Sequence, residues 1–129
     1  KLDYFIFNEP ALNGFSRGLS GKRNEADSAY RIETVIEVDV LPLRQVLDEY
    51  LPAGQEIDYL SIDVEGLDFE VLTSNDWKKY RPTYVLAEIL NSSLHEIDRS
   101  DISQYMQEVG YVPYAKCVNT VFFRKSSGD

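Results

Sequence analysis

Residues 58–66 (DYLSIDVEG) constrain the fold more than any other segment, because a run of strand-forming residues ends there in two acidic residues and a glycine. The apolar run through residues 59–64 predicts a parallel strand that is covered on both faces. Open α/β sheets bind ligands just beyond the carboxyl ends of such strands, so Asp63 and Glu65 occupy positions where catalytic groups are found. Gly66 permits a tight turn or the close approach of a ligand. The structural alternative is that the acidic residues only form a turn or cap a helix.

The composition describes a small, acidic, globular chain. Its 129 residues fit one domain, and a hydrophobic content of 43% is sufficient to build a core. The 13 Lys and Arg residues against 22 Asp and Glu give a net charge of -9, so the chain as a whole repels nucleic-acid backbones and anionic membrane surfaces. Cys117 is the single cysteine, and no segment is apolar over the length that spans a bilayer. These features predict no nucleic-acid partner, no membrane association and a soluble, cytoplasmic protein.

Hydrophobic periodicity predicts strands and helices that alternate through the middle of the chain. Strands are expected at residues 2–7, 31–40, 59–64 and 84–89, followed by an antiparallel hairpin of residues 111–115 and 118–124. Helices are expected around residues 43–51, 67–72 and 100–109. Residues 8–27, which contain Pro10 and three glycines, are expected to form a long surface loop.

This order predicts a single α/β domain over residues 1–125, with a polar tail at residues 126–129. Alternating strands and helices favour a three-layer αβα arrangement around a mainly parallel sheet with a terminal antiparallel hairpin. Asp68 and Glu70 are expected on the outer side of the helix that follows Gly66.

Three acidic residues, Asp63, Glu65 and Glu88, are the candidate catalytic groups. Glu88 ends the second apolar strand, so it is expected at the same sheet edge as the first two. A carboxylate can orient an acceptor, remove its proton or bind a divalent cation, and the sequence leaves these roles open. No residues are assigned to a metal. His95, in the loop after the same strand, is a further candidate base, although a solvated histidine is the commoner case.

Several segments together resemble the C-terminal half of FkbM-type methyltransferases. The main similarity lies in IDVEGLDFEVL (residues 62–72), YRP (residues 80–82) and VLAE (residues 85–88). It extends to FNEPALN (residues 7–13), VLPL (residues 40–43), GY (residues 110–111) and NTVF (residues 119–122). The resemblance therefore covers nearly the whole chain.

The resemblance implies a Rossmann-like class I fold that uses S-adenosylmethionine, commonly to methylate a hydroxyl group on a sugar or natural product. It implies that Asp63 and Gly66 lie beside the methyl donor, and that the partner is a small molecule with a hydroxyl acceptor. One departure is Ser61, which stands where the family often has Lys. Another is that the glycine-rich turn and the acidic ribose partner of nucleotide-binding folds are not found, since Gly14, Gly18 and Gly21 fall in the expected loop. The chain is therefore expected to be a fragment that is inactive alone.

Two alternative functions remain open, and one partner, a second copy of the chain, is expected. A non-catalytic α/β binding module would keep the sheet without the chemistry. A carboxylate-based glycosidase would use paired acids, but the length is too short for a β/α barrel. In the resembled fold, the strand at residues 59–64 pairs with a strand that is not found here, and this favours a homodimer through an exposed strand edge.

Overall fold

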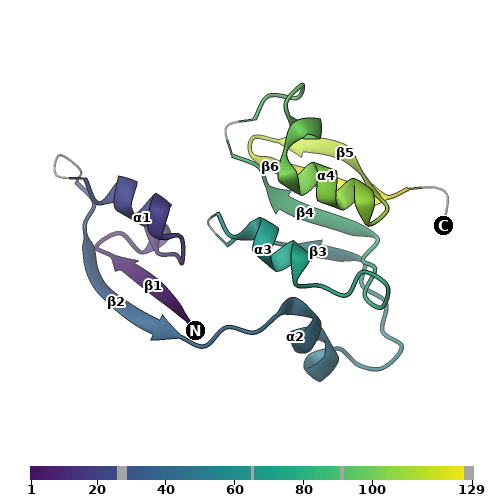
Figure 1. Cartoon of the computed structure of the whole chain (residues 1–129), viewed down its shortest axis with the longest axis horizontal. Helices are drawn as coiled ribbons and strands as arrows, with labels where there is room; N and C mark the ends of the chain where they lie inside the picture. Colours follow the sequence, from purple (N-terminus) through teal and green to yellow (C-terminus); the bar gives the residue numbers. More distant parts are fainter. Residues whose placement is uncertain (26–28, 65, 91, 127–129) are drawn as a thin grey trace. The chain divides into compact units, whose positions relative to one another are not determined.

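The computed structural model describes residues 1–25, 29–64, 66–90 and 92–126 (Figure 1). The chain divides into two compact units. Unit 1 comprises Lys1–Leu41 and Val64–Leu67, and unit 2 comprises Pro42–Asp63 and Asp68–Asp129.

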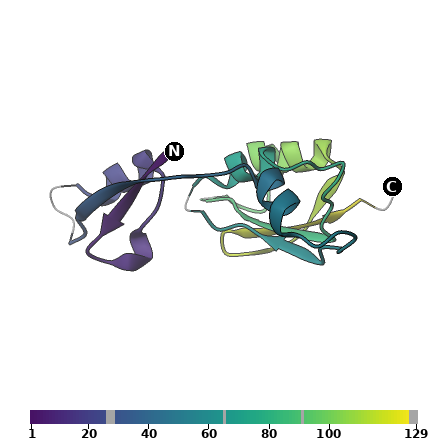
Figure 2. The same cartoon turned by 90° about the horizontal axis from the view of Figure 1, so that it is seen from below.

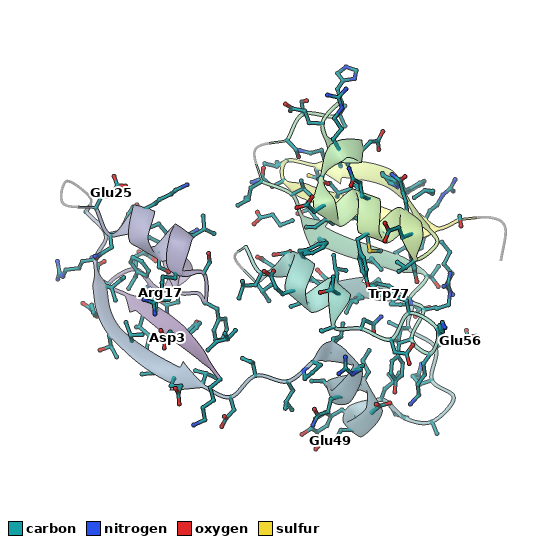
Figure 3. The ribbon with its side chains drawn as sticks, viewed as in Figure 1. Asp3, Arg17, Glu25, Glu49, Glu56 and Trp77 are labelled. Atoms are coloured by element: carbon teal, nitrogen blue, oxygen red, sulfur yellow. The ribbon has the colours of Figure 1, made fainter. Side chains whose placement is uncertain are left out.

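Unit 1 is built on an antiparallel strand pair. Its elements are β1 (Leu2–Phe7), the short 3-10 helix η1 (Pro10–Leu12), α1 (Arg17–Arg23) and β2 (Ile32–Val38). The prediction of a surface loop for residues 8–27 is wrong, because this segment contains η1 and α1. Ser16 begins α1 as its N-cap, since its side chain accepts a hydrogen bond from the N–H of Leu19. Arg17 on α1 pairs with Asp3 on β1 at 2.6 Å (Figure 3). This ion pair ties the helix to the strand.

Unit 2 contains a four-stranded mixed sheet. Its strands lie in the order β3 (Tyr59–Ser61), β4 (Tyr84–Glu88), β6 (Thr120–Lys125) and β5 (Tyr111–Cys117). The α/β class and the terminal hairpin are confirmed, but the prediction of a mainly parallel sheet is wrong. Among the described strands only β3 and β4 run parallel, since β6 lies between β4 and β5 and is antiparallel to both. The turn between β5 and β6 contains Val118, whose φ is 53°.

The helices of unit 2 are α2 (Leu43–Tyr50), α3 (Asp68–Thr73), the 3-10 helix η2 (Ile97–Arg99) and α4 (Asp101–Glu108). Figure 2 shows α3 and α4 over one face of the four-stranded sheet. The signals that predict α4 are confirmed. Ser100 is its N-cap, with Oγ accepting from the N–H of Ser103 at 3.1 Å, and Gly110 follows its end with a φ of 87°.

The face of the sheet under α3 and α4, here called the covered face, forms the core of unit 2. Its strand residues Val85, Ala87, Val121 and Phe123 are fully buried, and so are Leu72 of α3 and Met106 of α4. Two large aromatic side chains of this core, Tyr111 and Trp77, have their polar atoms hydrogen-bonded. The Tyr111 hydroxyl donates to the carbonyl of Pro82 at 2.7 Å, and the Trp77 indole donates to the carbonyl of Leu72 at 2.9 Å.

The opposite face of the sheet, here called the open face, carries the alternate residues of the same strands. Tyr59, Tyr84 and Tyr114 are 67%, 42% and 61% exposed there. Tyr59 pairs with Tyr84, and the rings of Tyr84 and Tyr114 lie 6.3 Å apart with Arg124 over the Tyr114 ring. The prediction of three layers is therefore wrong for the described part of unit 2, which has one sheet and helices over one of its faces.

Candidate functional site

Two of the predicted catalytic residues lie at the carboxyl ends of neighbouring strands. In the parallel pair, Ser61 of β3 stands opposite Leu86 of β4, and the N–H of Ile62 donates to the carbonyl of Leu86 at 2.9 Å. Extending this register by two residues sets Asp63 level with Glu88. The sheet thus brings these two carboxylates to one edge, although β3 itself is shorter than the predicted strand.

A hydroxyl group lies beside the same edge. Thr120, the first residue of β6, pairs directly with Glu88. Glu88 and Thr120 are half-buried and Asp63 is exposed, so all three can be reached from solvent. We call Asp63, Glu88 and Thr120 the acidic edge. The sequence motifs do not identify Thr120 as a site residue, because its place depends on the register of the hairpin.

Asp68 forms a hydrogen bond with the backbone of the acidic edge. Its side chain is 2% exposed, and its Oδ1 accepts a hydrogen bond from the backbone N–H of Glu88 at 2.9 Å. The prediction that Asp68 lies on the outer side of its helix is therefore wrong, while Glu70 is exposed as predicted. The physical reason is that the backbone N–H of Glu88 needs an acceptor, and the first residue of α3 supplies one.

The glycine of the acidic turn is required by its backbone and by its surroundings. Gly66 has a φ of 92°, a conformation that L side chains rarely adopt. A Cβ at this position would lie 2.8 Å from Cδ1 of Leu19, and both residues belong to unit 1. The close approach that glycine permits is thus made to a leucine side chain. Glu65, the other acid of the motif, lies outside the described residues.

The remaining glycines near the N-terminus do not form a cradle for a nucleotide cofactor. Gly18 and Gly21 lie within α1, and Gly14 pairs with Phe5 through two backbone hydrogen bonds of 2.9 and 3.2 Å. A cofactor cradle needs free backbone N–H groups between a strand and a helix. In the described part of the chain, these three glycines do not provide one.

The predicted loop histidine lies in a hydrogen-bonded turn after β4. The Ser93 hydroxyl and N–H both donate to Oε2 of Glu96, and these bonds hold the pKa of the Glu96 carboxyl below its usual value, with a smaller contribution from His95. His95 is exposed. Across the ranges that the structure describes, no cluster of three or more His, Cys, Asp or Glu side chains could hold a metal ion. None of the described helices has the length and apolar character needed to cross a membrane.

Comparison with known proteins gives one match. The family model described as "Methyltransferase FkbM domain" matches residues 3–113. This range includes Asp63, Glu88 and the whole of α3 and α4. No curated protein and no solved structure matches the chain.

Proposed function

Since the chain belongs to the FkbM methyltransferase domain family, we propose that it serves in methyl transfer from S-adenosylmethionine to a hydroxyl group of a sugar or natural-product acceptor. The family match over residues 3–113 is the observation that carries this proposal. The acidic edge supports it, because carboxylates at the carboxyl ends of adjacent strands are suited to bind and deprotonate a hydroxyl group.

Asp63 and Glu88 are the proposed acceptor-side groups. A carboxylate oxygen would accept a hydrogen bond from the acceptor hydroxyl, fix the direction of the oxygen lone pair and take the hydroxyl proton. Asp68 is proposed as a positioning residue, since it holds the backbone N–H of Glu88. Thr120 would donate or accept a further hydrogen bond beside Glu88.

The methyl donor, when bound, supplies the electrophilic methyl group. The described residues do not fit its nucleotide part. The Leu19 side chain occupies the space beside Gly66, and the three glycines near the N-terminus lie in a helix or in a β-bridge. Asp63 remains a predicted contact to the donor, and no step is assigned to Gly66. The donor is therefore expected to depend on groups other than those described here.

Binding of the donor tests this account of the cofactor. Titration calorimetry of this chain with S-adenosylmethionine is expected to give weak binding or none, because a nucleotide is held mainly by a glycine-rich turn and a helix N-terminus. Saturable binding in the low-micromolar range would contradict the expectation.

The catalytic assignment is tested by substitution of Asp63 in a transfer-competent protein that carries this domain. Asp63→Asn preserves shape and removes the charge, so it is expected to lower methyl transfer by about 10²–10⁴-fold with little change in thermal stability. Asp58→Asn, at the other end of the same strand, is the matched control and should retain activity. Unchanged turnover in Asp63→Asn would assign Asp63 a structural role.

A further inference from the structure

We propose that a second site, at the far end of unit 2 from the acidic edge, binds a small molecule that carries a phosphate group. The site is a cavity of about 670 Å³. Arg81, just before β4, and Gly110, just before β5, line it, so it lies at the edge where β4 begins and Glu88 is at the edge where β4 ends. The inference stands independently of methyl transfer.

Three basic side chains from separate segments converge on this cavity. Arg44 comes from α2, Lys78 from the turn after α3, and Arg81 from the segment before β4. Arg44 and Lys78 are exposed, and neither forms an ion pair with another described residue. Such a cluster is a local exception in a chain of net charge -9, and it concentrates positive potential in one hollow.

The Arg81 side chain is held in place by contacts with other groups of unit 2. Nη1 of Arg81 donates to the carbonyls of Trp77 and Val109, each at 3.3 Å, and its guanidinium lies 5.6 Å from the centre of the Tyr111 ring. Trp77 is itself buried and labelled in Figure 3. Arg81 is thus held before any ligand arrives, which reduces the entropy lost on binding.

The segment that carries Arg44 is also fixed to the rest of unit 2. The N–H of Leu43 donates to Oγ of Ser74 at 2.9 Å, and the Tyr80 hydroxyl donates to Asp48 of α2 at 2.5 Å. These bonds join α2 to the end of α3 and to the turn that bears Lys78. The backbone positions that carry Arg44 and Lys78 are therefore fixed relative to one another by these bonds.

The acidic residues around the cavity offset part of this charge, since Arg44, Lys78 and Arg81 face Asp76 and Glu108 and leave a lining of about one net positive charge. Oδ1 of Asp76 accepts from the N–H groups of Lys78 and Lys79 at 3.0 and 3.3 Å, so it caps the turn while it keeps its negative charge. Glu108 is the other carboxylate of the lining and is exposed. The remaining excess of positive charge suits a phosphate monoester, which carries about -1.5 to -2 at neutral pH and matches the planar fork of arginine. The cavity volume falls in the range of small-molecule sites, so a phosphorylated metabolite fits better than a bare ion.

The test is a titration of the ¹⁵N-labelled chain followed by NMR. The probes are inorganic phosphate and glucose 1-phosphate, with glucose and sodium chloride at matched ionic strength as controls. Saturable shifts are expected for the Lys78 and Gly110 amides and for the Trp77 indole, with tighter binding of glucose 1-phosphate than of phosphate. Equal shifts with chloride, or shifts confined to other parts of the chain, would overturn the proposal.

Variants that remove single charges test whether the binding depends on the charges that line this cavity. Arg44→Gln and Lys78→Gln are each expected to weaken glucose 1-phosphate binding by about two- to fivefold, the range for an exposed charge pair. Glu108→Gln is expected to tighten it, because a repelling charge is removed. Arg99→Gln, in η2 and outside the lining, is the matched control and should leave the affinity unchanged. A decrease in Arg99→Gln equal to that in Arg44→Gln, or no increase in Glu108→Gln, would show that the binding is not at this cavity.

Discussion

The two faces of the four-stranded sheet are made by the same strands and differ completely in their surroundings. Phe122 and Phe123 are neighbours on β6, yet Phe123 is fully buried under the helices and Phe122 lies on the open face. The alternation of side chains along a strand produces this difference. These strands therefore carry more apolar side chains than the described helices can cover.

The open face carries a row of exposed aromatic residues, which makes it a candidate interaction surface. Its tyrosines stand in direct register across β3 and β4, and Arg124 continues the row on β6. Large exposed apolar patches on soluble proteins mark sites that contact other molecules. The covered face therefore holds the core of unit 2, and a binding role for the open face stays a prediction.

The largest expected difference between the two faces is the loss of stability when Phe123 is replaced. Phe123→Ala leaves a cavity in the covered face and should lower the free energy of unfolding by about 3–5 kcal/mol. Phe122→Ala, the matched control one residue away, should cost less than about 1.5 kcal/mol, since the side chain is only half-buried. Urea unfolding of both variants measures the difference. Similar losses would mean that the open face is also covered in solution.

A smaller effect is expected from the titration of Tyr111 on the covered face. Burial raises the pKa of its hydroxyl to about 12 from an ordinary value of 10.0. The unfolded chain therefore loses this proton at lower pH than the folded chain, so the contribution to stability is complete below pH 10 and is lost between about pH 10 and 12.

The control for this prediction is Tyr111→Phe, which removes the titrating group. The difference in unfolding free energy between the two proteins should shrink by up to about 2 kcal/mol across that pH range. Urea unfolding at pH 9, 10 and 11 measures it. A difference that is constant with pH would contradict the assignment to Tyr111.

The smallest free-energy effect is expected from self-association at the edge strand β3, beside the open face. Tyr59 is exposed, and β3 is an edge strand among the strands that the structure describes, so pairing with a second copy is favoured and we expect a concentration-dependent dimer. Light scattering should show the mass rising from 14.8 kDa toward twice that value. Tyr59→Lys should abolish the rise, and Tyr114→Lys on the opposite edge strand should not. A mass that stays monomeric at high concentration would refute the expectation.

The parts of the fold that the sequence predicts correctly are those with local signals. Helix α4 is marked by Ser100 at its start and Gly110 at its end, and both act as expected. Helix α1 escapes prediction because Gly18 and Gly21 have low helix propensity and obscure the Ser16 cap. The sheet order also escapes, since the position of β6 between β4 and β5 depends on long-range pairing that spacing does not reveal.

The candidate site divides in the same way. The expectation that Asp63 and Glu88 meet follows from the general rule for parallel strand ends, and the register of β3 and β4, extended by two residues, agrees with it. Their role in a site stays a prediction. The inward position of Asp68 could not be predicted, because it depends on a single backbone N–H at the end of β4. The basic cavity could not be predicted either, since Arg44 and Arg81 line the same cavity only when α2 packs on the rest of unit 2.

The turn at Val118 has a consequence for the speed of folding. A β-branched residue with a φ of 53° carries strain of order 1–3 kcal/mol, here offset in part by a hydrogen bond from Lys116 to its carbonyl. The two strands of the β5–β6 hairpin are close in the sequence, so the hairpin is expected to form early, before β3 and β4 pair across the longer connection that contains α3. Strain already present in the transition state slows folding and leaves the unfolding rate nearly unchanged. The tip of the hairpin is therefore expected to affect how fast the chain folds more than how fast it unfolds.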